Sequence, residues 1–399
     1  MALLEILLAG WALLGHAIFW VGLANKSHAT GFPRRLITGL VGLAHAGLLL
    51  VPIALAWRAF RGQPGQSLSL TRPGDLGLTF YYVAFCWLVA LVHVPIWIRQ
   101  RLDRSGRRIL RQQQSKSYDV AAQLGRRPVS GLRATLLARV PGNQFLQLEV
   151  NEKLLAVPHL PPALEGFSLV HLSDLHFSGR VGPDYFRAVM ERADRLQGDL
   201  VAITGDLCDK SHCVEWIPEL LGPLESRFGK FCVLGNHDQK IRDRGRLHRT
   251  LVAAGCVDLG SETRTVAVPG GEIYLAGNEL PWFAAAPDVE MPPRNAGNSS
   301  PSFRILLSHS PDQFAWARAR DFDLVLAGHT HGGQIRLPLV GPVVCPSWSG
   351  AKYACGVFHE PPSILHVSRG ISSYTPLRIR CAPELTKLIL TRGGPEFPR

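Results

Sequence analysis

Three long apolar segments in the first hundred residues constrain the fold of this 399-residue chain more than any other feature. Residues 3–23 contain one charged residue, Glu5, and residues 36–57 and 76–98 contain none. Each segment has about the twenty residues that a helix needs to cross roughly 30 Å of hydrocarbon. A cleaved signal peptide is disfavoured, because the first segment lacks a basic start and two more segments follow it. We therefore predict a membrane anchor of three transmembrane helices over residues 1–98.

Positive charge is concentrated directly after the third segment. Residues 99–133 contain ten Lys or Arg and two acids, and so supply +8 of the chain's net charge of +12. A basic run next to a membrane span favours anionic lipid head groups, and no nucleic-acid-binding motif accompanies it. We predict a basic juxtamembrane linker over residues 99–150 that contacts anionic lipid through 99–133, with no nucleic-acid partner. The positive-inside rule then places the following domain in the cytoplasm.

Beyond the linker, short apolar runs alternate with helical patterns. The runs lie at 168–172, 200–204 and 231–234, and the helical patterns between them lie at 183–196 and 216–224. This order is typical of parallel strands joined by crossover helices. We therefore predict that residues 151–399 form an α/β domain.

Side chains that bind metals follow five of the expected strands. The five motifs are Asp174-Leu175-His176, Gly205-Asp206-Leu207-Cys208-Asp209, Gly235-Asn236-His237-Asp238, Ser308-His309-Ser310 and Gly328-His329-Thr330-His331. Residues two apart on an extended segment point the same way, so Asp174 and His176 can share one ion. In open α/β sheets the functional crevice lies outside the carboxyl ends of the strands, where these motifs can meet. One such motif alone would be read as a helix cap or a turn, but five at strand ends predict a shared metal site.

The five motifs resemble those of the calcineurin-like metallophosphoesterase superfamily, from residue 167 to about residue 391. The apolar spans, together with the run Gly328–Pro338, are similar to the bacterial, membrane-anchored YkuE-like phosphodiesterase branch. The resemblance implies a layered αββα sandwich with mixed sheets, which here follows the N-terminal transmembrane helices. It also implies an integral protein of the bacterial inner membrane.

The resemblance also implies a set of metal ligands. One ion would be held by Asp174, His176, Asp206 and His331, and the other by Asp206, Asn236, His309 and His329. Nitrogen and oxygen donors without thiolate suit Mn, Fe, Zn or Co, so we expect two divalent ions of this kind. Two such ions can share a hydroxide that attacks the phosphorus in line.

Two further residues are expected to be catalytic. His237 lies next to Asn236 and is predicted to act as the general acid that protonates the leaving oxygen. Asp238 is predicted to fix the tautomer of His237, although it has the alternative role of capping the following helix.

The predicted function is therefore hydrolysis of a phosphomonoester or phosphodiester by a membrane-anchored enzyme. The anchor makes a lipid-linked phosphate ester one of the candidate substrates. The same two-metal chemistry serves anhydrides, so a pyrophosphatase of the UDP-diacylglucosamine type, acting on a nucleotide-linked lipid, is an alternative. A non-catalytic metal-binding scaffold is a third interpretation, which the complete ligand set disfavours.

Overall fold

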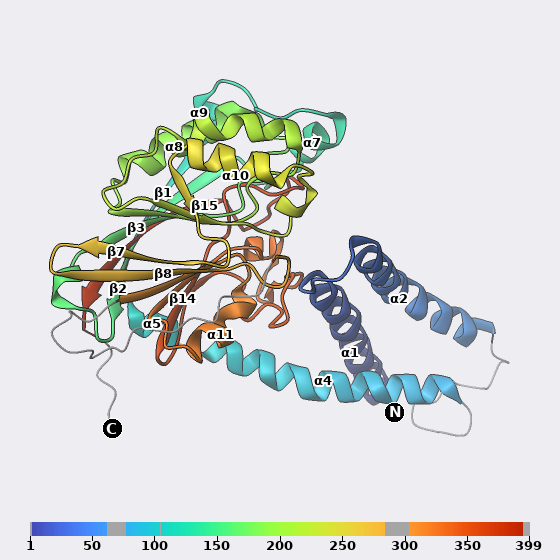
Figure 1. The fold of residues 1–399 in the computed structure, drawn as a ribbon. Coiled ribbons are helices and arrows are strands. Elements are labelled where there is room, and N and C mark those ends of the chain that lie inside the picture. Colours follow the sequence, from blue (N-terminus) through green and yellow to red (C-terminus); the bar gives the residue numbers. More distant parts are fainter. Residues whose placement is uncertain (1, 62–76, 104, 284–302, 394–399) are drawn as a thin grey trace. The chain divides into compact units, whose positions relative to one another are not determined.

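The structure is a computed structural model that describes residues 2–61, 77–103, 105–283 and 303–393, and the chain divides into two compact units, Met1–Asp103 and Arg104–Arg399 (Figure 1). The first unit contains helices α1 (Ala2–His28), α2 (Arg34–Arg61) and α4 (Leu78–Leu102). All three are long and apolar enough to cross a membrane. The three segments predicted from hydropathy therefore correspond to helices, except that residue 76 lies outside the described residues.

Helices α1 and α4 pack closely through a small residue and a polar contact. A Cβ added at Gly15 would lie 1.8 Å from the carbonyl oxygen of Cys86, so the two backbones touch at this point. The hydroxyl of Tyr82 accepts a hydrogen bond from Trp20 Nε1 at 3.0 Å and lies 2.6 Å from His16 Nδ1. Close approach at small residues, with polar side chains between helices, is how helices associate where lipid offers no hydrophobic driving force.

The second unit is built on two sheets whose inner faces share one apolar core. The first sheet has the order β1 (Leu110–Asp119), β2 (Gln147–Val157), β15 (Glu384–Arg392), β3 (Ser168–Leu172), β4 (Leu200–Thr204), β5 (Lys230–Val233), β6 (Cys256–Asp258). The second has the order β13 (Gly356–Glu360), β14 (Ser363–Val367), β10 (Leu324–Ala327), β9 (Phe303–Ser308), β8 (Gly271–Asn278), β7 (Thr263–Val268). A small hairpin is formed by β11 (Arg336–Leu337) and β12 (Gly341–Pro342). In the second sheet, parallel strands form the centre and antiparallel pairs close both edges. In the first sheet, β3, β4, β5 and β6 are parallel, β15 is antiparallel to β3 and parallel to β2, and β1 closes one edge antiparallel to β2.

Helices cover the outer faces of the two sheets (Figure 1). Helices α8 (Pro183–Arg195), α9 (Ile217–Leu221) and α10 (Arg244–Ala253) pack on the first sheet, and α11 (Phe314–Arg318) packs on the second. Helix α8 begins with Pro183, which suits a first helical turn, and buries an apolar stripe that includes Tyr185, Phe186 and Val189. The predicted αββα sandwich with mixed sheets is therefore confirmed.

Alternation along the strands separates the two cores. In β3, Leu169 faces the core between the sheets, whereas Val170 and Leu172 face the core under the helices. Strand β4 follows the same rule, with Leu200 between the sheets and Val201 under the helices. Successive side chains of a strand point to opposite faces, so a strand buried on both faces carries apolar residues at nearly every position.

The segment expected to be a linker is instead largely folded. It contains the short helices α5 (Ser105–Ile109), α6 (Val120–Gln123) and α7 (Leu132–Leu137), together with edge strand β1 and the start of β2. Strand β1 pairs antiparallel with β2, yet most of its side chains are exposed. A strand that is exposed to solvent on both faces has no alternation of apolar and polar residues, so its polar sequence did not predict a strand.

Five polar side chains are buried between the sheets and contact one another in series; we call them the inter-sheet cluster. Its members are Lys153 on β2, Glu384 on β15, His366 on β14, His171 on β3 and Thr204 on β4. Lys153 Nζ lies 2.6 Å from Glu384 Oε1 and 3.1 Å from His366 Nε2. His171 Nδ1 lies 2.8 Å from His366 Nδ1, and His171 Nε2 lies 2.8 Å from Thr204 Oγ1. The cluster thus connects the two sheets.

Burial determines the charges within the inter-sheet cluster. It lowers the pKa of His171 to about 3 and holds the pKa of His366 well below its usual range, so both imidazoles are neutral. Burial alone would raise the pKa of Glu384, but the cations of Lys153 and Arg369 hold that pKa well below its usual range. The carboxylate is therefore ionised and is compensated by its neighbours.

Candidate metal centre

Each residue expected to bind metal lies just beyond the carboxyl end of a strand. Asp174 and His176 follow β3, Asp206 follows β4, Asn236 follows β5, His309 follows β9, and His329 and His331 follow β10. Strands β3, β4 and β5 belong to the first sheet, and β9 and β10 belong to the second. The candidate ligands are thus supplied by both sheets, although more than 150 residues separate the first from the last.

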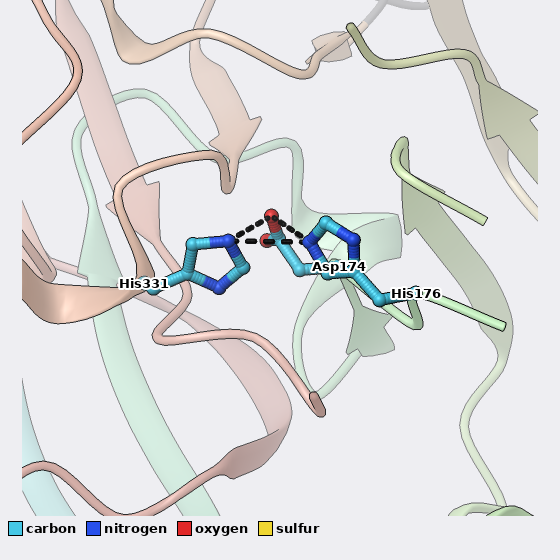
Figure 2. A group of neighbouring side chains, drawn as sticks. All are labelled: Asp174, His176 and His331. Atoms are coloured by element: carbon cyan, nitrogen blue, oxygen red, sulfur yellow. Dashed lines mark hydrogen bonds and ion pairs between the residues drawn. The ribbon is translucent and has the colours of Figure 1, made fainter. Parts of the chain in front are cut away.

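Asp174, His176 and His331 form the first group of candidate ligands, and all three are buried (Figure 2). One ligand atom from each lies within 4.8 Å of the others. His176 Nε2 lies 3.2 Å from His331 Nε2, and Asp174 Oδ1 lies 3.9 Å and 3.6 Å from these two nitrogens. The two imidazole nitrogens and the carboxylate oxygen therefore converge on one point between them.

Asp206, His309 and His329 form the second group, whose ligand atoms again lie within 4.8 Å of one another. His309 Nε2 lies 3.2 Å from His329 Nδ1 and 3.2 Å from Asn236 Oδ1. Asp206 Oδ2 lies 3.3 Å from His309 Nε2 and 3.5 Å from His176 Nε2, which belongs to the first group. One oxygen of Asp206 therefore faces both groups.

The backbone around the candidate ligands is held in an uncommon conformation. Asp174, His176, Asp206, His329 and His331 all have positive φ, between 50° and 70°. Residues other than glycine rarely adopt this left-handed backbone conformation, and clusters of such residues are typical of functional sites. Neighbouring glycines permit the close approach: a Cβ at residue 235 would lie 2.3 Å from Asp206 Oδ1, and one at residue 328 would lie 1.8 Å from the Ser173 hydroxyl.

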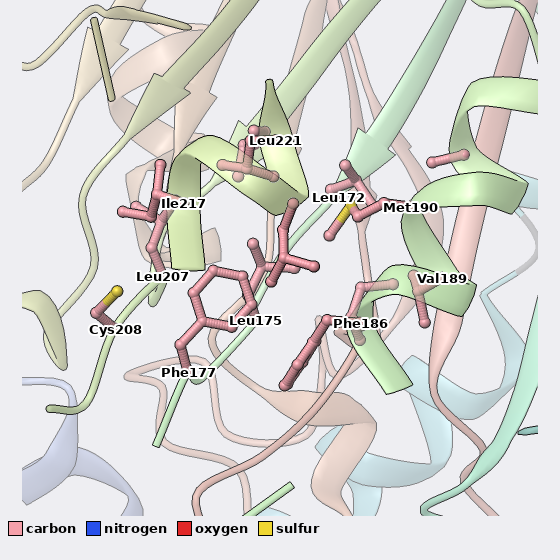
Figure 3. Packing of buried hydrophobic residues seen from close by; sticks show 14 of the residues in the cluster. Leu172, Leu175, Phe177, Phe186, Val189, Met190, Leu207, Cys208, Ile217 and Leu221 are labelled. Carbon is pink, nitrogen blue, oxygen red and sulfur yellow. The ribbon is translucent and has the colours of Figure 1, made fainter. Parts of the chain in front are cut away.

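Apolar side chains between the polar ones anchor these turns in the core under the helices (Figure 3). Leu175 lies between Asp174 and His176 in sequence and is fully buried in this core, as are Leu207 and Cys208 after Asp206. These two motifs therefore place packing residues between the residues that face the site. Cys208, with its buried thiol, belongs to the packing set.

Hydrogen bonds to the outer ring nitrogens orient two of the imidazoles. The carbonyl oxygen of Thr204 lies 2.8 Å from His309 Nδ1, and Asp209 Oδ2 lies 3.0 Å from His176 Nδ1. An acceptor at Nδ1 fixes the proton on that atom and leaves the Nε2 lone pair directed into the site, as is common for histidines that bind metals.

Asp209, rather than Asp238, contacts the predicted general acid. His237 Nδ1 is in contact with Asp209 Oδ1, and Lys240 Nζ lies 2.7 Å from the same oxygen. The carboxylate of Asp238 instead accepts hydrogen bonds from the backbone N–H groups of Leu207, Cys208 and Gly235, all within 3.3 Å. The expected tautomer-fixing role of Asp238 is therefore corrected: its side chain connects two loops.

Sequence reasoning missed the central place of Asp209. Its two oxygens contact His176 and His237, so one buried carboxylate joins a candidate ligand to the candidate acid. The only signal for this was its position three residues after Asp206, within the same motif. Asp238, as the immediate neighbour of His237, looked like the better partner, but adjacent side chains on a turn need not point the same way.

The donor set fits divalent cations. Carboxylate, amide and imidazole groups suit Mn, Fe, Zn or Co, and no thiolate lies among the grouped ligand atoms of the described residues. Burial opposes a charge on His309, but the Asp206 carboxylate beside it outweighs burial and raises the pKa of His309 to about 9. Positive charge next to Asp206 is thus favoured, and a bound cation would provide it.

The fold and the donor set together define the class of metal-dependent phosphoesterases. The chain belongs to the calcineurin-like phosphoesterase family, whose sequence profile matches residues 167–333. It is therefore a phosphoesterase, which hydrolyses phosphate esters.

Relatives with and without a named activity share this domain. The chain is 32% identical to the uncharacterized metallophosphoesterase YkuE of Bacillus subtilis, over 61% of this chain and 85% of that protein. It is 31% identical to the phosphodiesterase YaeI of Escherichia coli, over 56% of this chain and 82% of that protein. A transmembrane protein with metallophosphoesterase domain from Bos taurus is 28% identical, over 78% of this chain and 71% of that protein. The family membership predicted from the five motifs is confirmed.

Proposed function

We propose that the chain is a membrane-anchored phosphoesterase with two metal ions, which hydrolyses a phosphomonoester or a phosphodiester. One ion would be bound by Asp174, His176, Asp206 and His331, and the other by Asp206, Asn236, His309 and His329. The observation that supports this proposal most directly is the position of Asp206 Oδ2, within 3.5 Å of imidazole nitrogens from both groups. A carboxylate oxygen placed in this way suits a ligand shared by two cations.

The side chains divide the remaining chemistry between them. Two divalent cations would supply Lewis acidity toward the phosphoryl oxygens and lower the pKa of the attacking water. Burial lowers the pKa of His237, and Asp209, which contacts His237 Nδ1, opposes that shift and favours the protonated imidazole. Protonated His237 would then give its Nε2 proton to the leaving oxygen. Asn236 contributes a neutral oxygen donor, so the net negative charge near the substrate phosphate stays low.

Hydrolysis of bis(4-nitrophenyl) phosphate and 4-nitrophenyl phosphate tests the proposal. The purified full chain is first stripped with a chelator and then titrated with Mn²⁺, Zn²⁺ or Co²⁺, and metal content is measured in parallel. We expect activity to return as about two ions bind per chain. Asp206→Ala and Asn236→Ala should remain inactive under the same conditions.

The matched control is Asp258→Asn, since Asp258 pairs with the exposed His248. This variant should keep wild-type activity. Activity in the stripped enzyme without added metal, or equal activity in the Asp206→Ala variant, would contradict the proposal.

We also propose that the first unit anchors the enzyme in the bacterial inner membrane, with the second unit in the cytoplasm. The three apolar helices and the ten basic residues between 99 and 133 support this topology. A fusion of alkaline phosphatase to the C-terminus, compared with a fusion of green fluorescent protein, tests the orientation. A fluorescent fusion with an inactive phosphatase is expected, and the reverse result would contradict the topology.

A further inference from the structure

Exposed apolar side chains on the second unit are concentrated in two segments. Among the described residues from 105 onward, ten large hydrophobic side chains are exposed, and nine of them lie within 132–140 or 335–348. The most exposed is Leu339, at 98%, and Leu132 follows at 78%. Single exposed apolar residues need no explanation, but a concentration of them marks an interaction surface.

The two segments lie side by side because both border the loop at residues 376–380. Asn143, just beyond the first segment, forms a β-bridge with Ile379. Ile335, at the start of the second segment, forms another β-bridge with the same residue. We call the surface made by residues 132–140, 335–348 and 376–380 the apolar rim.

The exposed side chains of the apolar rim are of the kinds that contact membranes. Helix α7 carries Leu132 and Leu136 four residues apart, so these two side chains share one face, and exposed Val140 follows the helix. The β11–β12 hairpin presents Leu339 at its tip, and exposed Trp348 follows it. Leucine at a loop tip and tryptophan beside it are typical of segments that enter the interface of a bilayer.

The charged residues within the rim segments are all basic, and the carboxylate that contacts these segments, that of Asp312, accepts hydrogen bonds from the Ser347 hydroxyl and the backbone N–H of Trp348. The stretches 120–148, 324–359 and 361–383 contain no Asp or Glu. Arg133, Arg139 and Arg380, which lie in or beside the rim segments, are exposed. Anionic lipid head groups attract cations of this kind. The surface therefore combines apolar side chains that can enter lipid with arginines that can bind its head groups.

The apolar rim also adjoins the candidate metal centre. Ile335 follows the candidate ligand His331 by four residues. On the other side, Arg378 directly precedes Ile379, and one of its guanidinium nitrogens lies 3.3 Å from His331 Nδ1. If the apolar rim contacts a bilayer, the phosphate of a membrane lipid would lie close to the first group of candidate metal ligands.

We propose that the apolar rim seats on the anionic bilayer surface and that the substrate is a phosphate ester of a membrane lipid. The bilayer is the occupant favoured by the arginines, by the absence of acids in the stretches named above, and by three helices that can span a membrane. The part of the inference that concerns substrate rests on the proposed phosphoesterase function, whereas the membrane contact does not.

A spin label at the tip of the hairpin tests the contact. The full-length Leu339→Cys variant is labelled with a nitroxide and reconstituted into liposomes of phosphatidylcholine and phosphatidylglycerol. The matched control is Val252→Cys, which replaces the one other exposed large hydrophobic described in the second unit, on α10. Seven of the eight native cysteines are buried, so the labelled parent chain gives the background.

We expect the label at 339 to collide more with oxygen, which partitions into lipid, than with a water-soluble nickel complex. The label at 252 should show the opposite preference. Equal access of the nickel complex to both labels would overturn the proposed contact. Spin–spin broadening between labels at 339 would overturn it as well, because a second copy of the chain would then cover the rim.

Two substrates with the same leaving group test the substrate class. Bis(4-nitrophenyl) phosphate is soluble, whereas a phosphatidyl ester of 4-nitrophenol resides in the liposome. The double variant Leu337→Ser/Leu339→Ser should lose about tenfold or more of the rate on the lipid ester, since two leucines no longer enter the bilayer. Its rate on the soluble diester should change less than about twofold, as should both rates of Val252→Ser.

The outcomes separate this inference from the function on which it rests. The lipid-substrate proposal would be overturned if the double variant lost the same fraction of its rate on both substrates. It would also be overturned if the wild type cleaved the soluble diester but not the lipid ester. If the wild type cleaves neither ester, the phosphoesterase proposal fails, while the spin labels still decide the membrane contact.

Discussion

Two buried polar clusters lie close together in the second unit, and they differ in how their charges are compensated. In the inter-sheet cluster, the carboxylate of Glu384 faces the cations of Lys153 and Arg369 at 2.6 Å and 3.1 Å. In the candidate metal centre, Asp174 and Asp206 form their ion pairs with histidines. The carboxylate of the first cluster is thus compensated by permanently charged side chains, whereas the carboxylates of the second are paired only with histidines among the ion pairs of the described residues.

The comparison shows why burial of titratable groups does not by itself identify a functional site. Both clusters contain buried histidines and carboxylates, and both include strongly perturbed pKa values. They share strands as well, because His171 lies in β3 and Asp174 follows it. The distinguishing feature is a set of lone pairs directed at a common point, where a cation from outside the chain could bind.

Asp206→Asn should have the largest effect and should act on activity alone. Asparagine keeps the oxygen that accepts a hydrogen bond from the backbone N–H of His237 at 2.7 Å, but it removes the charge that both ligand groups face. Loss of one shared cation ligand should lower kcat/KM by about a thousandfold or more, whereas the melting temperature of the metal-free protein should stay the same or rise. Steady-state kinetics and thermal denaturation of the same preparations check this. A metal-free protein that melts far below the wild type would remove the contrast between the clusters.

Lys153→Met should show the opposite pattern. Breaking a buried ion pair by removing one partner leaves Glu384 with less compensation and should cost about 3–5 kcal/mol of unfolding free energy, on the order of 10 °C in melting temperature. Residual activity per folded molecule should stay near that of the wild type. The double variant Lys153→Met/Glu384→Leu should recover part of the stability, because no unpaired charge remains on this pair. A single variant as stable as the wild type would show that the cluster tolerates an unpaired charge.

Asp209→Asn tests a residue that has features of both clusters. Asp209 is paired with Lys240 at 2.7 Å, as in a structural cluster, but it also contacts His176 and His237. Loss of a partner that orients a ligand typically costs 10–100-fold, and we expect about this decrease in kcat. If Asp209 supports the general acid, the decrease should be larger for a phenyl leaving group than for 4-nitrophenyl, which needs less protonation. An equal decrease for both leaving groups would restrict Asp209 to metal binding, and Asp258→Asn again serves as control.

Much of the candidate site could be predicted, because its residues carry strong local signals. Asp174, Asp206, Asn236 and His329 each follow a short apolar run, and strand ends converge in a sheet of parallel strands. The partner of His237 could not be predicted in this way. Choosing between Asp209 and Asp238 requires knowing where each side chain points after the turn, and spacing along the chain does not contain that information.

The fold could likewise be predicted in part from the sequence. The parallel order β3-β4-β5 follows from apolar runs separated by crossover helices, and the structure has this order. The position of β15 between β2 and β3 could not be predicted, because it pairs the end of the chain with segments more than 200 residues earlier. Strand β1 was missed for a different reason, since its exposed polar side chains have no period that distinguishes a strand from a linker.

The smallest expected effect concerns pH and again separates the clusters. His171 faces His366 from β14 and Thr204 from β4, with Lys153 and Glu384 beyond them, and burial lowers its pKa from 6.5 to about 3. At a pH between these two values, His171 therefore carries a proton in the unfolded chain but not in the folded chain. The stability due to neutral His171 is fully present above pH 6.5 and is lost as the pH falls toward 3, by at most about 1.4 kcal/mol per pH unit. His171→Gln should reduce the slope of unfolding free energy between about pH 5 and pH 6, whereas replacing the exposed His248 by Gln should not. An unchanged slope in His171→Gln would mean that protonation reaches the inter-sheet cluster through His366 instead, so that its neutrality is a property of the pair.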